Sequence, residues 1–144
     1  MLDKLKVKKV KRNIKSFIGT NFMVFIDGYN LKKVFPVRAE AELTTSYVAG
    51  NIIDVSDANQ LILYVKFTKG LLTSAEIKIE FSADNTTFYQ ERNSIDALKT
   101  HSFNADGNYR LVIPVMEKYV KVSAKGTGTV TDSKMQIDAL VGTA

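Results

Sequence analysis

The sequence predicts an all-β protein, an antiparallel β-sandwich with a jelly-roll-like order of strands. In residues 61–68 and 76–81, large apolar side chains fall at every second position. This period of two, with many β-branched and aromatic residues, is typical of half-buried strands. Turn-forming residues separate such segments at intervals of roughly 8–14 residues, which is the spacing of a sandwich or barrel. Helical periodicity is nearly absent beyond residue 18.

The clearest unit runs from residue 58 to residue 91 and contains two strands and the start of a third. A loop around Gly70 joins the first two strands. After the second strand, residues 82–87 read Ser-Ala-Asp-Asn-Thr-Thr. Asp and Asn tolerate a left-handed backbone and accept hydrogen bonds from their own turns. We therefore expect the chain to reverse there and to return antiparallel through residues 88–91.

The remaining strands follow from shorter segments with the same alternation. We expect them at 43–48, 88–94, 98–103, 109–114, 119–125 and 135–141. Pro114 should end one of these strands, and the glycine-containing residues 126–129 should end the next. About eight strands in residues 39–144 suit a jelly roll, with an immunoglobulin-like sandwich as the alternative. Without crossover helices, a parallel α/β fold is excluded.

Three segments are expected along the chain: a basic arm at 1–18, a small hairpin or extended segment at 19–38, and the sandwich domain at 39–144. In the middle segment, residues 22–26 form an apolar strand candidate and Asp27-Gly28 a turn. Residues 31–37 would form the return strand, which Pro36 restricts to a sheet edge or to its own end.

The net charge of +5 belongs to the N-terminal arm. Residues 1–16 hold seven basic residues and one acidic residue, which leaves 13 basic and 14 acidic residues for 17–144. The 144 residues suit one domain, and the absence of cysteine excludes disulfides and thiolate metal sites. The apolar stretch 17–26 is too short to span a membrane, and no cleavage site follows it. We expect a soluble, unprocessed chain without a membrane partner.

The arm is the candidate partner-binding segment. Val7, Val10, Ile14 and Phe17 are spaced to share one helical face, although an extended arm fits nearly as well. Basic residues surround this face, and docking on a protein neighbour suits the pattern best. Nucleic-acid contact is an alternative, but no aromatic residues are interleaved with the lysines to stack on bases. The candidate residues are Lys4, Lys6, Val7, Lys8, Lys9, Val10, Lys11, Arg12, Ile14, Lys15, Phe17 and Ile18.

No catalytic, metal or cofactor motif is recognisable, and we expect no enzyme activity, metal or cofactor. His101 is the single histidine and is interpreted as an ordinary edge or surface residue. The loops with Asp54, Asp57, Asp84 and Asn85 lack the ligand density of a calcium site. The carboxylates at 76 and 80 alternate outward with the lysine at 78, which indicates a solvated sheet face.

The segment Leu61–Glu91 resembles a recurring element of tailed-bacteriophage virion proteins, in which a Thr-Lys-Gly loop precedes a hairpin of the type "ikieFS-x-D-[NG]-x-x-[FY]". A similar hairpin occurs in discoidin-like carbohydrate-binding jelly rolls, but there glycine is usual at position 85 and tryptophan at position 88. The residues that match the phage element are Thr68, Lys69, Gly70, Ile77, Ile79, Phe81, Ser82, Asp84, Asn85, Phe88 and Tyr89.

The phage resemblance implies a structural virion protein, such as a head-decoration, auxiliary capsid or head-to-tail protein. It implies assembly in the host cytoplasm and capsid or connector subunits as partners, in a homo-oligomer or a larger assembly. Our leading hypothesis is therefore a non-enzymatic protein that assembles through its sandwich and docks its arm on neighbouring subunits. The alternative is a carbohydrate- or surface-binding module that uses the turns at 82–87 and 104–108.

Overall fold

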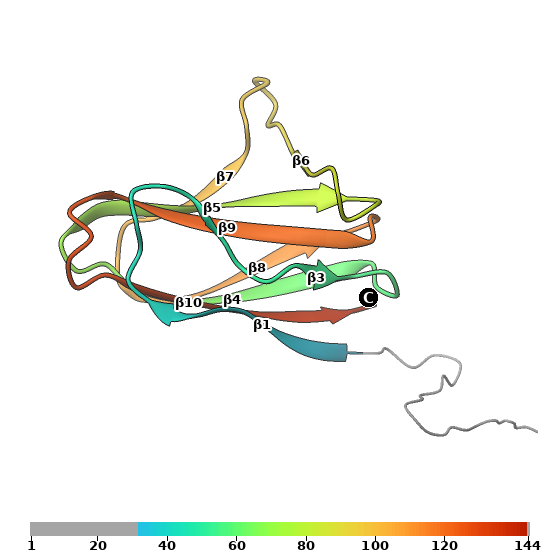
Figure 1. Ribbon diagram of the computed structural model, residues 1–144, viewed down its shortest axis with the longest axis horizontal. Coiled ribbons are helices and arrows are strands. Elements are labelled where there is room, and N and C mark those ends of the chain that lie inside the picture. The colour runs from blue at the N-terminus through green and yellow to red at the C-terminus, as the bar shows by residue number, and fades with distance from the viewer. Residues whose placement is uncertain (1–31, 144) are drawn as a thin grey trace, which may run out of the picture. The chain divides into compact units, whose positions relative to one another are not determined.

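The computed structural model describes residues 32–143, which form two antiparallel sheets stacked as a sandwich (Figure 1). The four-stranded sheet pairs β1 (Lys32–Ala41), β10 (Lys134–Gly142), β4 (Gln60–Thr68) and β8 (Gly107–Pro114), in that order. In the six-stranded sheet, β9 (Tyr119–Gly128) lies between β5 (Leu72–Ser82) and the short strands β2 (Val48–Ala49) and β3 (Ile53–Asp54). On its other side, β5 pairs with β6 (Tyr89–Gln90) and β7 (Thr100–Phe103). Residues 32–143 contain no helix long and apolar enough to cross a membrane.

The order of strands is that of a jelly roll. The short strands β2 and β3 together occupy one position in the strand order, and so do β6 and β7. The ten strands therefore fill eight positions. The first position then pairs with the eighth, the second with the seventh, the third with the sixth and the fourth with the fifth. A long antiparallel hairpin rolled into two sheets produces this pattern. The prediction of an all-β, antiparallel, jelly-roll-like sandwich is confirmed, and the immunoglobulin-like alternative does not fit this strand order.

The core lies between the two sheets, where the predicted alternation places it. On β4, the odd-numbered residues from Leu61 to Phe67 are buried, and on β5 Ala75, Ile77 and Ile79 are buried. Strand β10 lies beside β4 in the same sheet and adds Met135, Ile137, Ala139 and Val141 to the same core. Every second residue of each long strand therefore removes apolar surface from water, which is the main stabilising contribution to such a fold.

Strand β1 belongs to the sandwich, which places the start of this domain earlier than expected. It pairs with β10 from Lys32 to Ala41, across the expected boundary between residues 38 and 39. Pro36 lies within the strand, and the register shifts between Pro36 and Arg38. A proline lacks an N–H group, so it is tolerated where the strand forms a sheet edge and bulges. The prediction that Pro36 confines its strand to an edge is confirmed, whereas the segments before residue 32 lie outside the described residues.

The predicted strand at residues 43–48 is wrong for most of its length. Residues 42–47 form a loop, and only Val48 and Ala49 pair with β9. The side chain of Leu43 is buried, but its N–H donates to the Ser133 hydroxyl at 3.2 Å instead of to a neighbouring strand. A buried leucine therefore anchors a loop here. The expected strand at 88–94 is likewise shorter, since only Tyr89 and Gln90 pair with β5.

The turn after β5 forms as predicted. Ser82 is buried, and its Oγ accepts hydrogen bonds from the N–H groups of Asp84 (3.2 Å) and Asn85 (2.9 Å). The Asp84 carboxylate accepts from the N–H groups of Thr86 and Thr87, each at 2.9 Å. Asn85 has a φ of +62°, the left-handed conformation that asparagine tolerates. The polar groups of the turn are thus largely satisfied within the turn itself.

Candidate functional site

The outer face of the four-stranded sheet carries a row of apolar side chains, which we call the apolar row. Ile62 on β4 is paired with Val112 on β8 and with Leu140 on β10, and Leu140 is paired with Val34 on β1. All four side chains point away from the core, because their neighbours along each strand fill it. Val34 is 73% exposed and Val112 45% exposed, while Ile62 and Leu140 are half-buried. The row therefore crosses the full width of the sheet.

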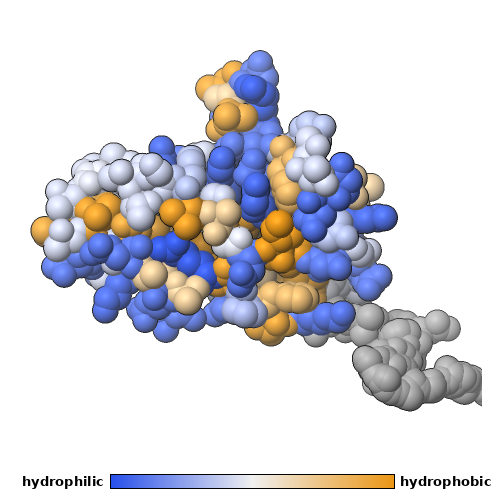
Figure 2. All heavy atoms as spheres, in the orientation of Figure 1, coloured by the Kyte–Doolittle hydropathy of each residue, from blue (hydrophilic) through white to orange (hydrophobic). Residues whose placement is uncertain are grey.

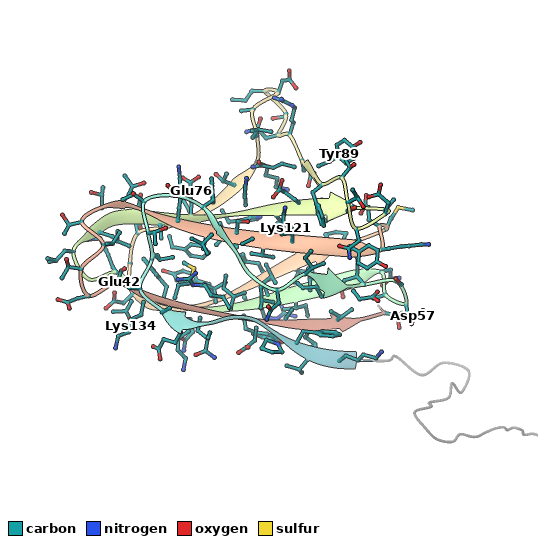
Figure 3. The ribbon with its side chains drawn as sticks, in the orientation of Figure 1. Glu42, Asp57, Glu76, Tyr89, Lys121 and Lys134 are labelled. Carbon is teal, nitrogen blue, oxygen red and sulfur yellow. The ribbon has the colours of Figure 1, made fainter. Side chains whose placement is uncertain are left out.

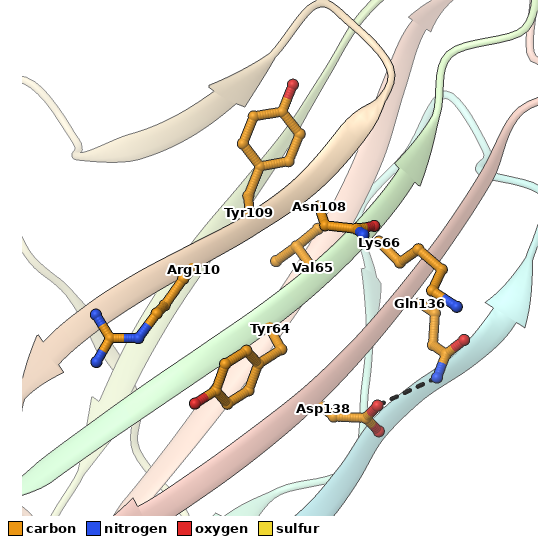
Figure 4. A pocket seen from close by; sticks show the side chains of 8 residues that line it. All are labelled: Tyr64, Val65, Lys66, Asn108, Tyr109, Arg110, Gln136 and Asp138. Atoms are coloured by element: carbon orange, nitrogen blue, oxygen red, sulfur yellow. Dashed lines mark hydrogen bonds between the residues drawn. The ribbon is translucent and has the colours of Figure 1, made fainter.

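Beside the apolar row lies a shallow hollow of about 280 Å³, centred on Tyr64 (Figure 4). Tyr64 is 43% exposed and is paired with Arg110 on one side and Asp138 on the other. Gln136 donates a hydrogen bond to Asp138 at 3.1 Å. We call this set the Tyr64 hollow; the side chains that line it are Tyr64, Val65, Lys66, Asn108, Tyr109, Arg110, Gln136 and Asp138.

The Tyr64 hollow contains polar side chains that residues 32–143 do not engage. Among the interactions of the described residues, none engages the side chains of Lys66, Asn108 or Arg110. A lysine, an amide and a guanidinium together offer several donors and one acceptor beside an exposed aromatic ring. The hollow and the adjoining apolar row thus combine apolar contact area with polar groups at its border, which is typical of interaction surfaces.

The outer face of the six-stranded sheet is different, because its charges are paired. Glu76, Lys78 and Glu80 point outward from β5, as predicted from their alternation. Glu80 forms ion pairs with Lys78 at 3.8 Å and with Lys121 of β9 at 3.9 Å. Mixed, mutually paired charge keeps this face solvated and offers little to a partner.

Tyr47 covers part of this charged face from the loop before β2. Its hydroxyl donates a hydrogen bond to Glu76, and its ring lies 4.7 Å from the Lys78 ammonium and 4.9 Å from that of Lys125. Burial raises the pKa of the Tyr47 hydroxyl, and the hydrogen bond and the charge of Glu76 raise it further. The hydroxyl is therefore a neutral hydrogen-bond donor and no candidate nucleophile. This cluster fastens the loop to the sheet.

A groove of about 530 Å³, which we call the end groove, lies at the end of the sandwich where β5 finishes. Its apolar lining includes Phe81, Tyr89, Pro114 and Met116, and Figure 3 shows Tyr89 at this end. Met116 is 95% exposed and Tyr89 69% exposed. Two carboxylates, from Glu91 and Glu117, complete the border of the groove.

Next to the end groove, the loop between β6 and β7 projects from the sandwich (Figure 1) and carries apolar side chains near its tip (Figure 2). Ile95 is 81% exposed, and Leu98 is 52% exposed. Arg92 and Leu98 form an isolated antiparallel bridge at the base of the loop, and Asp96 adopts a φ of +63°. This loop therefore carries exposed apolar side chains of its own, near the end groove.

His101 lies on β7, an edge strand, as expected. It is half-buried, and burial lowers its pKa, with a further lowering from Lys99 and an opposing effect of Glu91. The imidazole is therefore neutral at physiological pH. No nucleophile or carboxylate among the described residues is hydrogen-bonded to it.

Two of the carboxylates considered as metal ligands are engaged within their own loops. Asp54 accepts a hydrogen bond from the N–H of Ser56 at 2.9 Å. The carboxylate of Asp84 is held by its turn, as described above. In residues 32–143, no group of three or more histidine and carboxylate side chains could hold a metal ion.

The predicted partner-binding arm, residues 1–18, lies outside the described residues, so its placement stays a prediction. The sequence analysis missed the apolar row. The available signal was Ile62 of the row together with Tyr64 of the hollow, since both occupy outward positions of the predicted strand where polar residues are usual. The other members of the row lie far away in sequence and meet only through strand pairing.

No protein-family model and no curated protein sequence matches the chain. Similar solved structures include that of the SPBc2 prophage-derived protein YomS, with 21% identity, a TM-score of 0.48 and coverage of 83% of this chain and 99% of the other. The pili of Bacillus endospore appendages match at 13% identity and a TM-score of 0.46, with 85% and 96% coverage. The VP2 subviral particle of infectious bursal disease virus matches at 14% identity and a TM-score of 0.45. This match covers 90% of this chain but 37% of the viral chain. The fold assignment rests on the strand order itself.

Proposed function

We propose that the chain is a non-enzymatic structural protein of a phage virion, with a decoration, auxiliary capsid or connector role. It assembles by covering the outer face of its four-stranded sheet and by docking residues 1–18 on neighbouring subunits. The observation that carries the proposal is the apolar row. A solvated sheet face normally carries polar side chains, and a contiguous apolar strip across four strands is typical of a contact surface.

Two further features support this proposal. The first is the basic, amphipathic arm, which has apolar side chains that a merely solvated tail does not need. The second is the resemblance of residues 61–91 to a virion element. In this chain, Ser82, Asp84 and Asn85 of the matching segment form a turn in which Asn85 has a left-handed backbone.

The test is incorporation into particles. We expect the full-length chain to co-sediment with phage particles in a density gradient, at a fixed copy number per particle. A chain that lacks residues 1–18 should keep the β-sheet circular dichroism spectrum of the full chain and be absent from the particles. If the shortened chain is incorporated at the normal copy number, the proposed role of the arm is wrong.

The Tyr64 hollow favours a second candidate function, the binding of a saccharide. An exposed aromatic ring offers a flat apolar surface to a sugar ring, and the Arg110, Asn108 and Lys66 side chains, which no described residue engages, offer hydrogen bonds to hydroxyl groups. Asn108 belongs to the turn region 104–108 that the sequence suggested, whereas the turn 82–87 uses its polar groups internally. Glycan-array binding by the full chain that is lost in Tyr64→Ala would favour this function. No bound glycan on the array would exclude it for the glycans displayed.

A further inference from the structure

We propose that the end groove is the receptor for the basic arm of a neighbouring copy of this chain, and that residues 7–17 of that copy place their apolar side chains against Tyr89 and Met116. This inference rests on the proposed function, because it specifies where the arm docks. It concerns a surface at the end of the sandwich, separate from the outer face that carries the apolar row.

The chemistry of the groove matches the apolar residues of the arm. Phe81, Tyr89, Pro114 and Met116 present apolar surface at the place where the sandwich ends. Methionine has a flexible, polarizable side chain that adapts to different apolar partners, and Met116 is almost fully exposed. The volume of about 530 Å³ suits the side chains of a short segment rather than a whole domain.

The charge of the groove matches the basic residues of the arm. Glu91 and Glu117 lie at the border of the apolar surface, and the arm brings seven basic residues against one acidic residue. Glu91 is paired with Lys99 at 3.8 Å, but both side chains are about half exposed. Such surface pairs contribute little stability, so a lysine of the arm can replace Lys99 at low cost. Charge complementarity of this kind sets orientation and speeds association.

The position of the groove is within reach of an arm. Lys32, where the described chain begins, is aligned through Gly142 and Gln60 with Pro114 at the groove. Three strand spacings separate the backbones of Lys32 and Pro114, which is about 14 Å. The 14 residues from Ile18 to Lys32 can extend to about 46 Å. The surplus length allows an arm to leave its own sandwich and to reach the equivalent groove of an adjacent copy.

Cysteine cross-linking of the full-length chain tests the proposal, because the natural chain has no cysteine. One variant carries Val10→Cys and a second carries Met116→Cys; mixing the two and oxidising them reports only contacts between copies. The matched control replaces Met116→Cys with Leu71→Cys. Leu71 is also apolar and exposed (62%), but it precedes β5 and so lies about 35 Å from the groove, at the other end of that strand.

We expect mass spectrometry to find the disulfide between positions 10 and 116 at about ten times the yield of that between 10 and 71, because docking raises the local concentration. Adding Glu91→Lys and Glu117→Lys to the Met116→Cys variant should lower this yield. Equal yields at 116 and 71, or a yield unchanged by charge reversal, would overturn the proposal. The proposed function is tested separately: if the arm is needed for incorporation into particles but does not cross-link to position 116, it docks elsewhere.

Discussion

Ile62 on β4 and Val112 on β8 lie directly opposite each other, and both side chains point outward from the four-stranded sheet. On the other side of Ile62, Leu140 and Val34 continue the same row to the far edge. The full burial of an aliphatic side chain contributes about 1.5–3 kcal/mol relative to exposure. Binding of a partner over this sheet face is therefore favourable, because it removes these apolar side chains from water. The opposite face, with Glu80 between two lysines, has no comparable apolar surface.

The Ser82 hydroxyl is predicted to be the main support of the turn after β5. Ser82→Ala removes the acceptor of two backbone N–H groups at a buried position, so the free energy of unfolding should fall by about 1–3 kcal/mol. Urea denaturation followed by circular dichroism measures this difference. The control is Thr87→Ala, whose side chain is exposed, and it should change the stability by less than about 0.5 kcal/mol. Equal effects of the two substitutions would show that the hydroxyl has no special role.

Asn85 is predicted to be replaceable by glycine with a gain in stability. Its φ of +62° is unfavourable for residues with a Cβ atom and neutral for glycine. Asn85→Gly should raise the free energy of unfolding by a few tenths of a kcal/mol, up to about 1 kcal/mol, whereas the β-branched Asn85→Val should lower it by about 1–2 kcal/mol. Thermal denaturation of the two variants and the natural chain measures this order of stabilities. A valine variant at least as stable as the glycine variant would contradict the left-handed backbone.

The contribution of Asp84 to stability is predicted to depend on pH. Hydrogen bonds from the N–H groups of Thr87 and Thr86 and from the Ser82 hydroxyl lower the pKa of its carboxyl below the ordinary 3.8. Because the folded-state pKa is the lower one, the stabilisation is present at neutral pH and disappears as the pH falls below about 4.

Urea denaturation at pH 7 and at pH 3 measures this effect. The difference in stability between the natural chain and Asp84→Asn should be larger at pH 7 than at pH 3. Asp57→Asn is the control, since the exposed Asp57 carboxylate accepts no hydrogen bond in the described part of the chain. A difference for Asp84 that is the same at both pH values would contradict the assignment.

The sequence predicted those strands and turns that depend only on residues close together in the chain. The strands predicted at 61–68 and 76–81, their buried residues and the Ser82-Asp84 turn follow from alternation and from side-chain hydrogen bonds over two or three residues. Residues 126–128 show the limit of this approach: β9 runs on to Gly128, which has a φ of +97°, although the glycines predicted an earlier end. Pairing with β5 holds the strand past the glycine at 126.

Features that depend on distant pairing were left open or missed. The sequence predicted a jelly roll but left the immunoglobulin-like alternative open, because the pairing of β1 with β10, about a hundred residues apart, decides between them. The same pairing brings Val34 beside Leu140 and completes the apolar row. The loop at 42–47 has strand-like residues, but a side-chain hydrogen bond to Ser133 replaces the ladder there. Neither the groove at Met116 nor the row at Ile62 has a pattern in any single stretch of sequence.

The most direct test of assembly through the four-stranded sheet is sedimentation velocity of the full-length chain. The natural chain should sediment as an oligomer, above the 16.0 kDa of one copy. The double variant Val34→Lys/Val112→Lys, which changes two exposed residues of the apolar row and leaves the arm intact, should sediment as a smaller species than the natural chain, with an unchanged circular dichroism spectrum. The control Leu71→Lys should sediment like the natural chain. A double variant that keeps the oligomer would contradict the role of this face.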